Sequence, residues 1–334
     1  DSTRLRNWLG RGRVASLHGD PHLTTMDGVN YDFQGAGEYV ALRTSTGTEI
    51  QVRLGPVETS YIPGAAPYHE LATCVSVTSA VAATVGDHRV TYQPGLDTVP
   101  SPNGMELRVD GQLVTLGASG LDLGNGGRIS KTAAPGGLQV DFPDDTVLLV
   151  TPGFWESQQK WYLNISIATH PAMFLEGSSS DSQVPGGLVA ALAPDSWLPV
   201  MPDGTSLGSM PDSLAERYID LYQKFGNTWR VTDESSLFDY APGLSTANFV
   251  IGDWPPQEGT CAVFTKPLPP TIPVQVAEEA CQGVKDDAQR ENCVFDVMTT
   301  GDTVFAETYL ASQAVLAALV DPVAEEVQAT GLII

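Results

Sequence analysis

Short runs of alternating apolar and polar residues fill the chain from about residue 30 to residue 170, and they constrain the fold more than any other feature. Runs such as EYVALR, EIQVRL, TVLLVTP and KWYLNISIA are separated by glycine, proline, asparagine or aspartate. Such alternation is typical of strands with one buried face. Asp110-Gly111, which lies between two of the runs, favours a tight hairpin. The sequence therefore predicts a mainly β protein with two packed antiparallel sheets in a sandwich-like arrangement.

Helical patterns follow the strands. PDSLAERYIDLYQKF has apolar residues at helical spacing, FTKPLPPTIPVQ indicates a semi-rigid connector, and the tail from residue 276 is helical and acidic. We therefore expect a helical C-terminal extension on the β fold. The expected division is an N-terminal arm or linker over 1–15, a β-sandwich-like domain over 16–265, and a proline-rich connector with an acidic helical subdomain over 266–334.

The charge balance limits the classes of partner. The chain carries 17 Lys and Arg against 40 Asp and Glu, a formal net charge of −23, which argues against nucleic acid as a partner. No run of 18 or more apolar residues occurs, so we expect no transmembrane segment. The opening DSTRLRNWLGRGR lacks the apolar region of a signal peptide, which is typical of a mature product or an excised piece.

Four cysteines occur without a CxxC pair, which argues against a zinc cluster or a thioredoxin-like site. Their even number favours two disulfides and an oxidising compartment, although four free buried cysteines are the alternative. Among the three possible pairings we favour Cys281–Cys293 with Cys74–Cys261. The reason is that Cys281 and Cys293 flank two short consecutive helical patterns.

The most specific motif is GDPHLTTMDGVNYDFQGAGEYVAL, at residues 19–42. It resembles the start of the von Willebrand factor type D domain, in which Gly-Asp-Pro-His precedes Thr-x-Asp-Gly, Tyr-x-Phe-x-Gly and a first strand. Three later segments are similar to later parts of the family and follow in the same order: GGLVAALAPDSWLPVMPDGTSL, KFGNTWRVTDESSLFDY and ENCVFDVMTTGDTVFAETY. The resemblance therefore runs from about residue 16 to residue 312. The chain is most similar to the cysteine-poor branch found in large membrane mucins and related surface proteins.

The resemblance implies a calcium site. In the family, calcium ties the aspartate of Thr-x-Asp-Gly, here Asp27, to a loop that corresponds to residues 186–196. That loop departs from the family pattern, because Asp195 is its only acidic side chain. Calcium prefers six to eight oxygen ligands. The alternative is that Asp27-Gly28 is a turn in which the aspartate hydrogen-bonds its own backbone.

The Asp20-Pro21 bond implies a second kind of chemistry. An aspartyl carboxyl can attack its own carbonyl group while proline leaves as an amine, and some family members cut themselves at Gly-Asp-Pro-His. His22 or His18 could protonate the leaving nitrogen. The alternative is that Asp20, Pro21 and His22 form a structural turn.

The resulting functional hypothesis is a non-enzymatic structural or adhesion module, secreted or at the cell surface. It would act through contacts with other proteins of an extracellular assembly, including copies of itself, with calcium as a stabilising ion. No P-loop or HExxH motif is present. The alternatives are self-cleavage at Asp20-Pro21 and a lipid or ligand carrier, because type D modules also occur in egg-yolk lipoproteins. Asn164, in Asn-Ile-Ser, is a candidate glycosylation site if the source is eukaryotic and the side chain faces outward.

Overall fold

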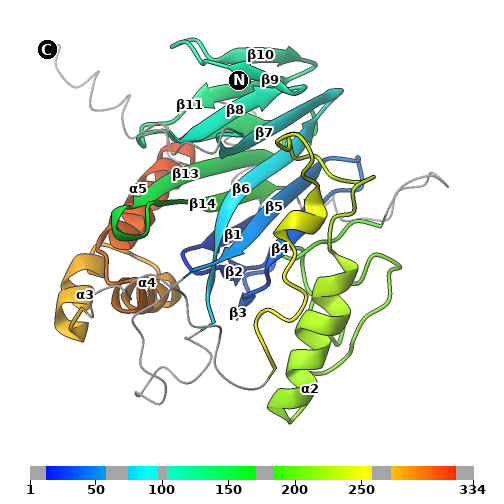
Figure 1. The fold of residues 1–334 in the computed structure, drawn as a ribbon, viewed down its shortest axis with the longest axis vertical. Coiled ribbons are helices and arrows are strands. Elements are labelled where there is room, and N and C mark those ends of the chain that lie inside the picture. The colour runs from blue at the N-terminus through cyan, green and yellow to red at the C-terminus, as the bar shows by residue number, and fades with distance from the viewer. Residues whose placement is uncertain (1–12, 58–73, 97–103, 171–183, 258–271, 321–334) are drawn as a thin grey trace, which may run out of the picture.

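The protein folds as two antiparallel β-sheets with helices at either side (Figure 1). The structure is a computed structural model, and it describes residues 13–57, 74–96, 104–170, 184–257 and 272–320. The predicted fold class is confirmed, since the two sheets have eight and six strands and the two longest helices lie near the C-terminus.

The larger sheet has the strand order β10-β11-β12-β13-β14-β1-β2-β3. Its strands are β1 (Arg13–His18), β2 (His22–Thr24), β3 (Asn30–Asp32), β10 (Leu121–Gly124), β11 (Gly127–Lys131), β12 (Leu138–Asp141), β13 (Val147–Trp155) and β14 (Lys160–Thr169). The first strand therefore pairs with the last strand, β14, and lies inside the sheet. Because β1 begins at Arg13, residues 13–15 belong to this sheet and not to an arm.

The smaller sheet is a meander in which each strand pairs with the next along the chain. Its strands are β4 (Gly37–Arg43), β5 (Glu49–Pro56), β6 (Ser76–Val85), β7 (His88–Pro94), β8 (Met105–Val109) and β9 (Gln112–Val114). The predicted hairpin at Asp110-Gly111 joins β8 to β9, and both residues have the positive φ that such a turn requires.

The main core lies between the sheets. Fully buried aliphatic side chains such as Ile50 and Val52 from one sheet and Ile165 and Ile167 from the other form it. Among the described residues, the gap between the sheets holds a cavity of only about 10 Å³, lined by apolar side chains. The packing therefore resembles an ordinary close-packed sandwich.

The predicted helices are present. α2 (Leu214–Tyr218) continues as η4 (Ile219–Gly226), and α3 (Val274–Cys281), α4 (Asp287–Thr300) and α5 (Val304–Val320) form the C-terminal group. Two short turns, η2 (Glu156–Gln158) and η5 (Thr246–Phe249), complete the described helical elements. None of the described helices is long and apolar enough to cross a lipid bilayer.

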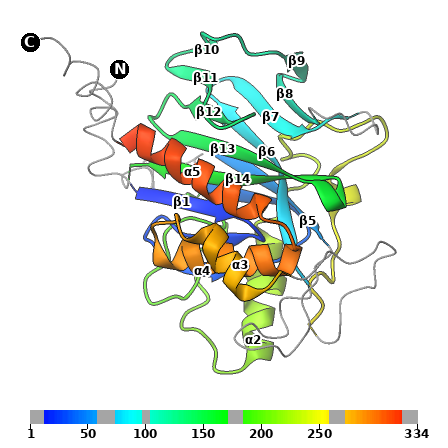
Figure 2. The ribbon, with the colours of Figure 1, turned by 90° about the vertical axis from the view of Figure 1, so that its left-hand side faces the viewer.

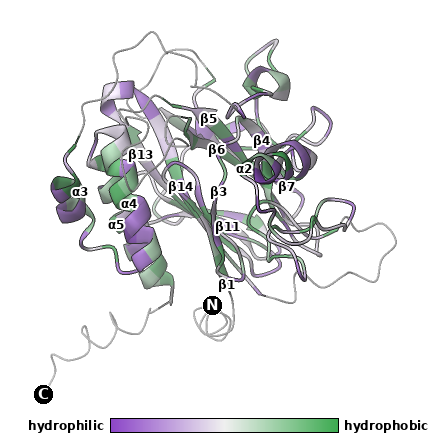
Figure 3. Cartoon of the chain, turned by 90° about the horizontal axis from the view of Figure 1, so that it is seen from below, coloured by the Kyte–Doolittle hydropathy of each residue, from purple (hydrophilic) through white to green (hydrophobic). Residues whose placement is uncertain are grey.

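The C-terminal helices pack directly on the larger sheet. α5 lies across β13 and β14 (Figure 2), and the group lies on the opposite side of the molecule from α2 (Figure 3). The ring of Phe305 stacks on Tyr162 of β14 at a centroid distance of 4.2 Å and meets Trp155 edge-on. The helices therefore share one apolar core with the sheet.

A disulfide between Cys281 and Cys293 joins α3 to α4, which confirms the predicted pairing. Both sulfur atoms lie in the core shared with the sheet. The other predicted pair cannot be described in the same way, because Cys261 lies outside the described residues; Cys74 is buried beside Ala36 and Trp254.

Candidate functional site

The Gly19-Asp20-Pro21-His22 motif forms the tip of the hairpin between β1 and β2. His18 and His22 are paired across the hairpin, so Gly19, Asp20 and Pro21 make the turn. Gly19 has a φ of +59°, in the left-handed region that glycine adopts without strain. Although hairpin tips are usually exposed, Asp20 is completely buried and His22 is 6% exposed. The fold therefore encloses the most labile kind of peptide bond in its interior.

Three other segments hold the backbone of this turn. Asn164 Oδ1, on β14, accepts the Gly19 N–H at 2.9 Å, and Asp296 Oδ1, on α4, accepts the Asp20 N–H at 3.4 Å. Gln34 Nε2 donates a hydrogen bond to the Asp20 carbonyl oxygen at 3.2 Å. The carbonyl group of the Asp20-Pro21 bond thus has a donor aimed at its oxygen.

His22 lies at the centre of a group of carboxylates. Its Nε2 atom is 2.8 Å from Asp20 Oδ1 and 3.2 Å from Asp296 Oδ1. Its Nδ1 atom is 2.6 Å from Oδ1 of Asp32, whose side chain is 64% exposed. Both carboxylate oxygens of Asp20 are buried without a hydrogen bond of good geometry among the described residues, so the contact of Oδ1 with His22 is an ion-pair contact. Tyr309, on α5, donates its hydroxyl to Asp296 Oδ2 at 3.1 Å.

These surroundings shift the protonation of the cluster. Burial, together with the negative charge of Asp296, raises the pKa of Asp20 well above its usual value. Burial alone would lower the pKa of His22, but the carboxylates of Asp20, Asp32 and Asp296 outweigh it and raise that pKa well above 6.5. The surroundings therefore favour the protonated forms of Asp20 and His22 more than water does.

His18, the histidine directly before the motif, differs from His22 in its protonation. Burial and the nearby His22 lower the pKa of His18 to about 4, so His18 is neutral at neutral pH. Its Nε2 atom lies 3.3 Å from Ser166 Oγ, and its ring meets Tyr309 edge-on. Of the two candidate proton donors, His22 is the one that contacts Asp20.

The cluster also has a spacing that a metal ion could use, since ligand atoms of Asp20, His22 and Asp296 lie within 4.8 Å of one another. However, the separations of 2.8 and 3.2 Å are those of direct ion pairs and hydrogen bonds. In this structure the three side chains therefore contact one another directly.

Asp27 lies where the calcium hypothesis requires it, beside the 186–196 loop. Both of its carboxylate oxygens accept the Leu192 N–H, at 3.3 and 3.2 Å, and Oδ1 also accepts the Thr25 hydroxyl at 2.6 Å. Asp195 is exposed, and no hydrogen bond or ion pair joins it to Asp27 within the described part of the chain. The Asp27 carboxylate lies beside the loop, and a calcium ion there would need further oxygen ligands in addition to it. Calcium binding stays a prediction.

The structure corrects the glycosylation hypothesis. Asn164 is 1% exposed, and its amide oxygen accepts the Gly19 N–H. A glycan on Nδ2 would need space that the interior does not offer. Asn164 therefore belongs to the site at Asp20, and in the folded chain it does not face outward.

Three further residues of the site escaped the sequence analysis, namely Gln34, Asp32 and Asp296. Only Asp296 had a signal, because it ends the Cys-x-x-Asp pattern of ENCVFD. Sequence alone cannot tell that this aspartate meets a motif 276 residues earlier.

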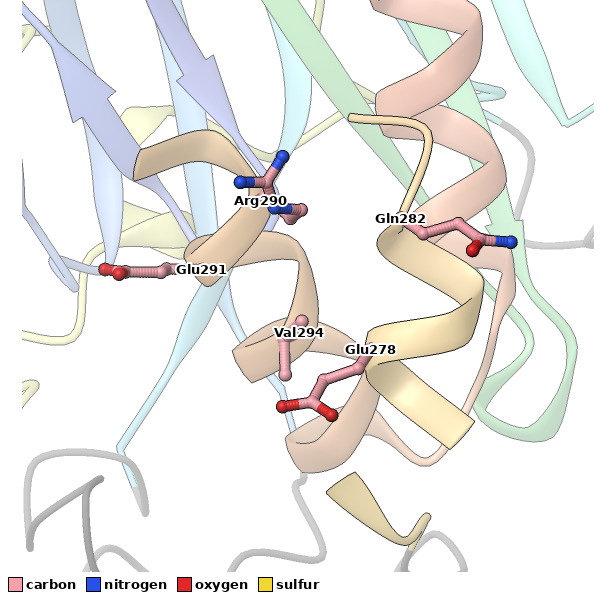
Figure 4. Close-up of a pocket in the computed structure, with 5 residues that line it drawn as sticks. All are labelled: Glu278, Gln282, Arg290, Glu291 and Val294. Atoms are coloured by element: carbon pink, nitrogen blue, oxygen red, sulfur yellow. The ribbon is translucent and has the colours of Figure 1, made fainter. Parts of the chain in front are cut away.

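A separate pocket of about 410 Å³ lies between α3 and α4 (Figure 4). Its lining includes Glu278 from α3, Gln282 directly after α3, and Arg290 and Glu291 from α4. Glu291 is exposed, whereas Asp296 is fully buried, so these residues lie on different faces of α4. The pocket is therefore not an entrance to the Asp20 site.

Fold and site together define a class: a two-sheet β module in which C-terminal helices close over a buried Gly-Asp-Pro-His turn. Residues 15–159 match the family model of the von Willebrand factor type D domain, which confirms the resemblance. Human Sushi domain-containing protein 2 is 28% identical over 294 residues, which cover 86% of this chain. The chain spans 31% of the length of that relative.

Proposed function

We propose that this chain is an extracellular contact and assembly module that cuts its own backbone between Asp20 and Pro21. The type D domain, the similarity to a sushi-domain protein and the Cys281–Cys293 disulfide support an extracellular module. The observation that carries the self-cleavage is the buried contact of 2.8 Å between Asp20 and His22, next to a carbonyl group that already has a donor.

The reaction has two steps. An oxygen of the Asp20 carboxyl attacks the main-chain carbonyl carbon of the same residue, and the bond to the Pro21 nitrogen breaks. The products are a cyclic anhydride at Asp20 and a free amine at Pro21, which takes the proton that the carboxyl gives up. Water then opens the anhydride and leaves Asp20 with two carboxyl groups. One peptide bond is hydrolysed, and one water molecule is consumed.

The side chains around the bond fit these steps. His22 Nε2 contacts Asp20 Oδ1, so a protonated His22 can deliver its proton to the departing nitrogen and take up the proton that the carboxyl gives up. Asp32 holds the opposite ring nitrogen and so fixes the orientation of the imidazole. Gln34 donates to the oxygen on which negative charge develops during the attack.

Cleavage at this place would modify the module without dismantling it. Residues 13–17 pair with β14 on one side, and the β1–β2 ladder also reaches Leu23 and Thr24 beyond the cut. This supports a role as an assembled contact module, because the reaction acts once on the chain and not on an external substrate.

The test is a time course of denaturing electrophoresis and intact mass on the folded chain. We expect fragments 1–20 and 21–334, and we expect Asp20→Asn to remain uncut because the amide cannot form the anhydride. The matched control is Asp87→Asn, the same change at an exposed aspartate. A wild-type chain that stays intact through long incubation would contradict the proposal.

Calcium binding at Asp27 is a separate proposal, supported by the position of Asp27 against the 186–196 loop. We expect added calcium to raise the melting temperature of the wild-type chain but not that of Asp27→Asn. Equal curves with calcium and with chelator would contradict it.

A further inference from the structure

Asp296 is the one group of the site that arrives from the C-terminal helices. Its side chain is fully buried, and its Oδ1 atom lies 3.4 Å from the Asp20 nitrogen and 3.2 Å from His22 Nε2. Gly19 approaches so closely that a Cβ at that position would lie 1.6 Å from Asp296 Oδ2. The Asp296 carboxylate is thus in close contact with the turn that contains the Asp20-Pro21 bond.

The position of Asp296 depends on the whole helical group. Tyr309 on α5 holds Asp296 Oδ2, and α5 is fixed to the sheet by the hydrogen bond of 2.7 Å between Thr308 and Tyr162. The Cys281–Cys293 disulfide ties α4 to α3, and Cys293 lies one helical turn before Asp296. Neither the helices nor their disulfide belong to residues 15–159, which match the type D family model.

We propose that Asp296 is a positioning residue for the self-cleavage, and that the chain therefore cuts itself only after its C-terminal helices have docked. This inference rests on the proposed function and names the element that controls it. Asp296 acts through two contacts of its Oδ1 atom. The contact with the Asp20 N–H orients the backbone at Asp20, and the contact with His22 Nε2 keeps this nitrogen beside the Asp20 carboxyl. Without the helices, the Asp20 turn would lose this carboxylate and would be open to water.

The pH dependence follows from the charges that face His22. Asp20 is its neighbour in the turn, Asp32 lies on β3, Asp296 on α4 and Tyr309 on α5, and His18 is neutral. The charge of Asp296 contributes to the raised pKa of both Asp20 and His22. Its removal lowers both pKa values, so the site loses its protons at a lower pH. The alkaline decline of the cleavage rate should therefore move toward lower pH.

The experiment compares the cleavage rate of the refolded full chain with the rates of three variants. Asp296→Asn keeps the size of the side chain and removes its charge, and we expect it to cleave on the order of tenfold or more slowly, with the alkaline decline at lower pH. Tyr309→Phe removes only the hydroxyl that holds Asp296, and we expect a smaller slowing. The matched control is Glu291→Gln, a loss of charge on an exposed side of α4, which should cleave like the wild type.

Near-ultraviolet circular dichroism establishes that each variant is folded, and Tyr309→Phe carries the test if Asp296→Asn does not fold. If the folded variants cut themselves at the wild-type rate and with the wild-type pH profile, the role of Asp296 is overturned while the proposed function stands. If the wild-type chain itself stays intact, the proposed function falls, and the control by the helices falls with it.

Discussion

Gly19 shows how closely single residues are fitted at this site. It needs a positive φ, and its missing side chain leaves the space that Asp296 occupies. The motif residues Asp20, Pro21 and His22 could be predicted from the sequence, because they are contiguous. Gln34, Asn164 and Asp296 could not, since each acts through a contact across the fold that no local pattern encodes.

Gly19→Ala is therefore expected to destabilise the fold more than a glycine substitution that disturbs only the backbone. Gly28→Ala is the matched control, because Gly28 also has a positive φ but nothing lies within 4 Å of its Cβ position. The backbone cost should be roughly 1–2 kcal/mol at either position. The contact with Asp296 should add about 1–3 kcal/mol at Gly19. Urea unfolding measures both, and equal losses would contradict the close contact.

Gln34 offers a test of the carbonyl contact. Its Nε2 donates to the Asp20 oxygen, while its Oε1 accepts the Ser76 N–H at 2.7 Å. Gln34→Glu keeps an acceptor for Ser76 and removes the donor to Asp20. We expect self-cleavage to slow by about 10²-fold, the usual effect of losing one such donor. A rate equal to that of the wild type, measured by intact mass, would show that Gln34 has no part in the reaction.

At the scale of elements, the long alternating strands and the C-terminal helices could be predicted, because each presents enough residues to reveal its period. The short strands β2 and β3 have three residues each and show no such period. The sequence also did not predict that β1 lies inside the larger sheet. Its partner β14 is far along the chain, and only the closed sheet brings the two together.

The interior position of β1 leads to a prediction for the cut chain. Five residue pairs join β1 to β14 and three join it to β2, so the fragment 1–20 should remain bound after cleavage. Size-exclusion chromatography in native buffer should give one peak that contains both fragments, and denaturant should separate them. Loss of the short fragment in native buffer would contradict the strand order described here.

At the scale of the whole molecule, the type D domain and the helical group form one packed unit around the Asp20 turn. The formal net charge of −23 favours partners that are not polyanions. The chain spans under a third of the length of its human relative, so the similarity does not identify the partners of this chain.

The most direct test of the central claim is to refold the uncut full chain in water enriched in ¹⁸O and to analyse the products by mass spectrometry. The account predicts a new N-terminus at Pro21 and ¹⁸O in Asp20, part of it in the side-chain carboxyl because water can open the anhydride at either carbonyl. An intact chain, a cut at another bond, or ¹⁸O confined to the main-chain carboxyl of Asp20 would contradict it.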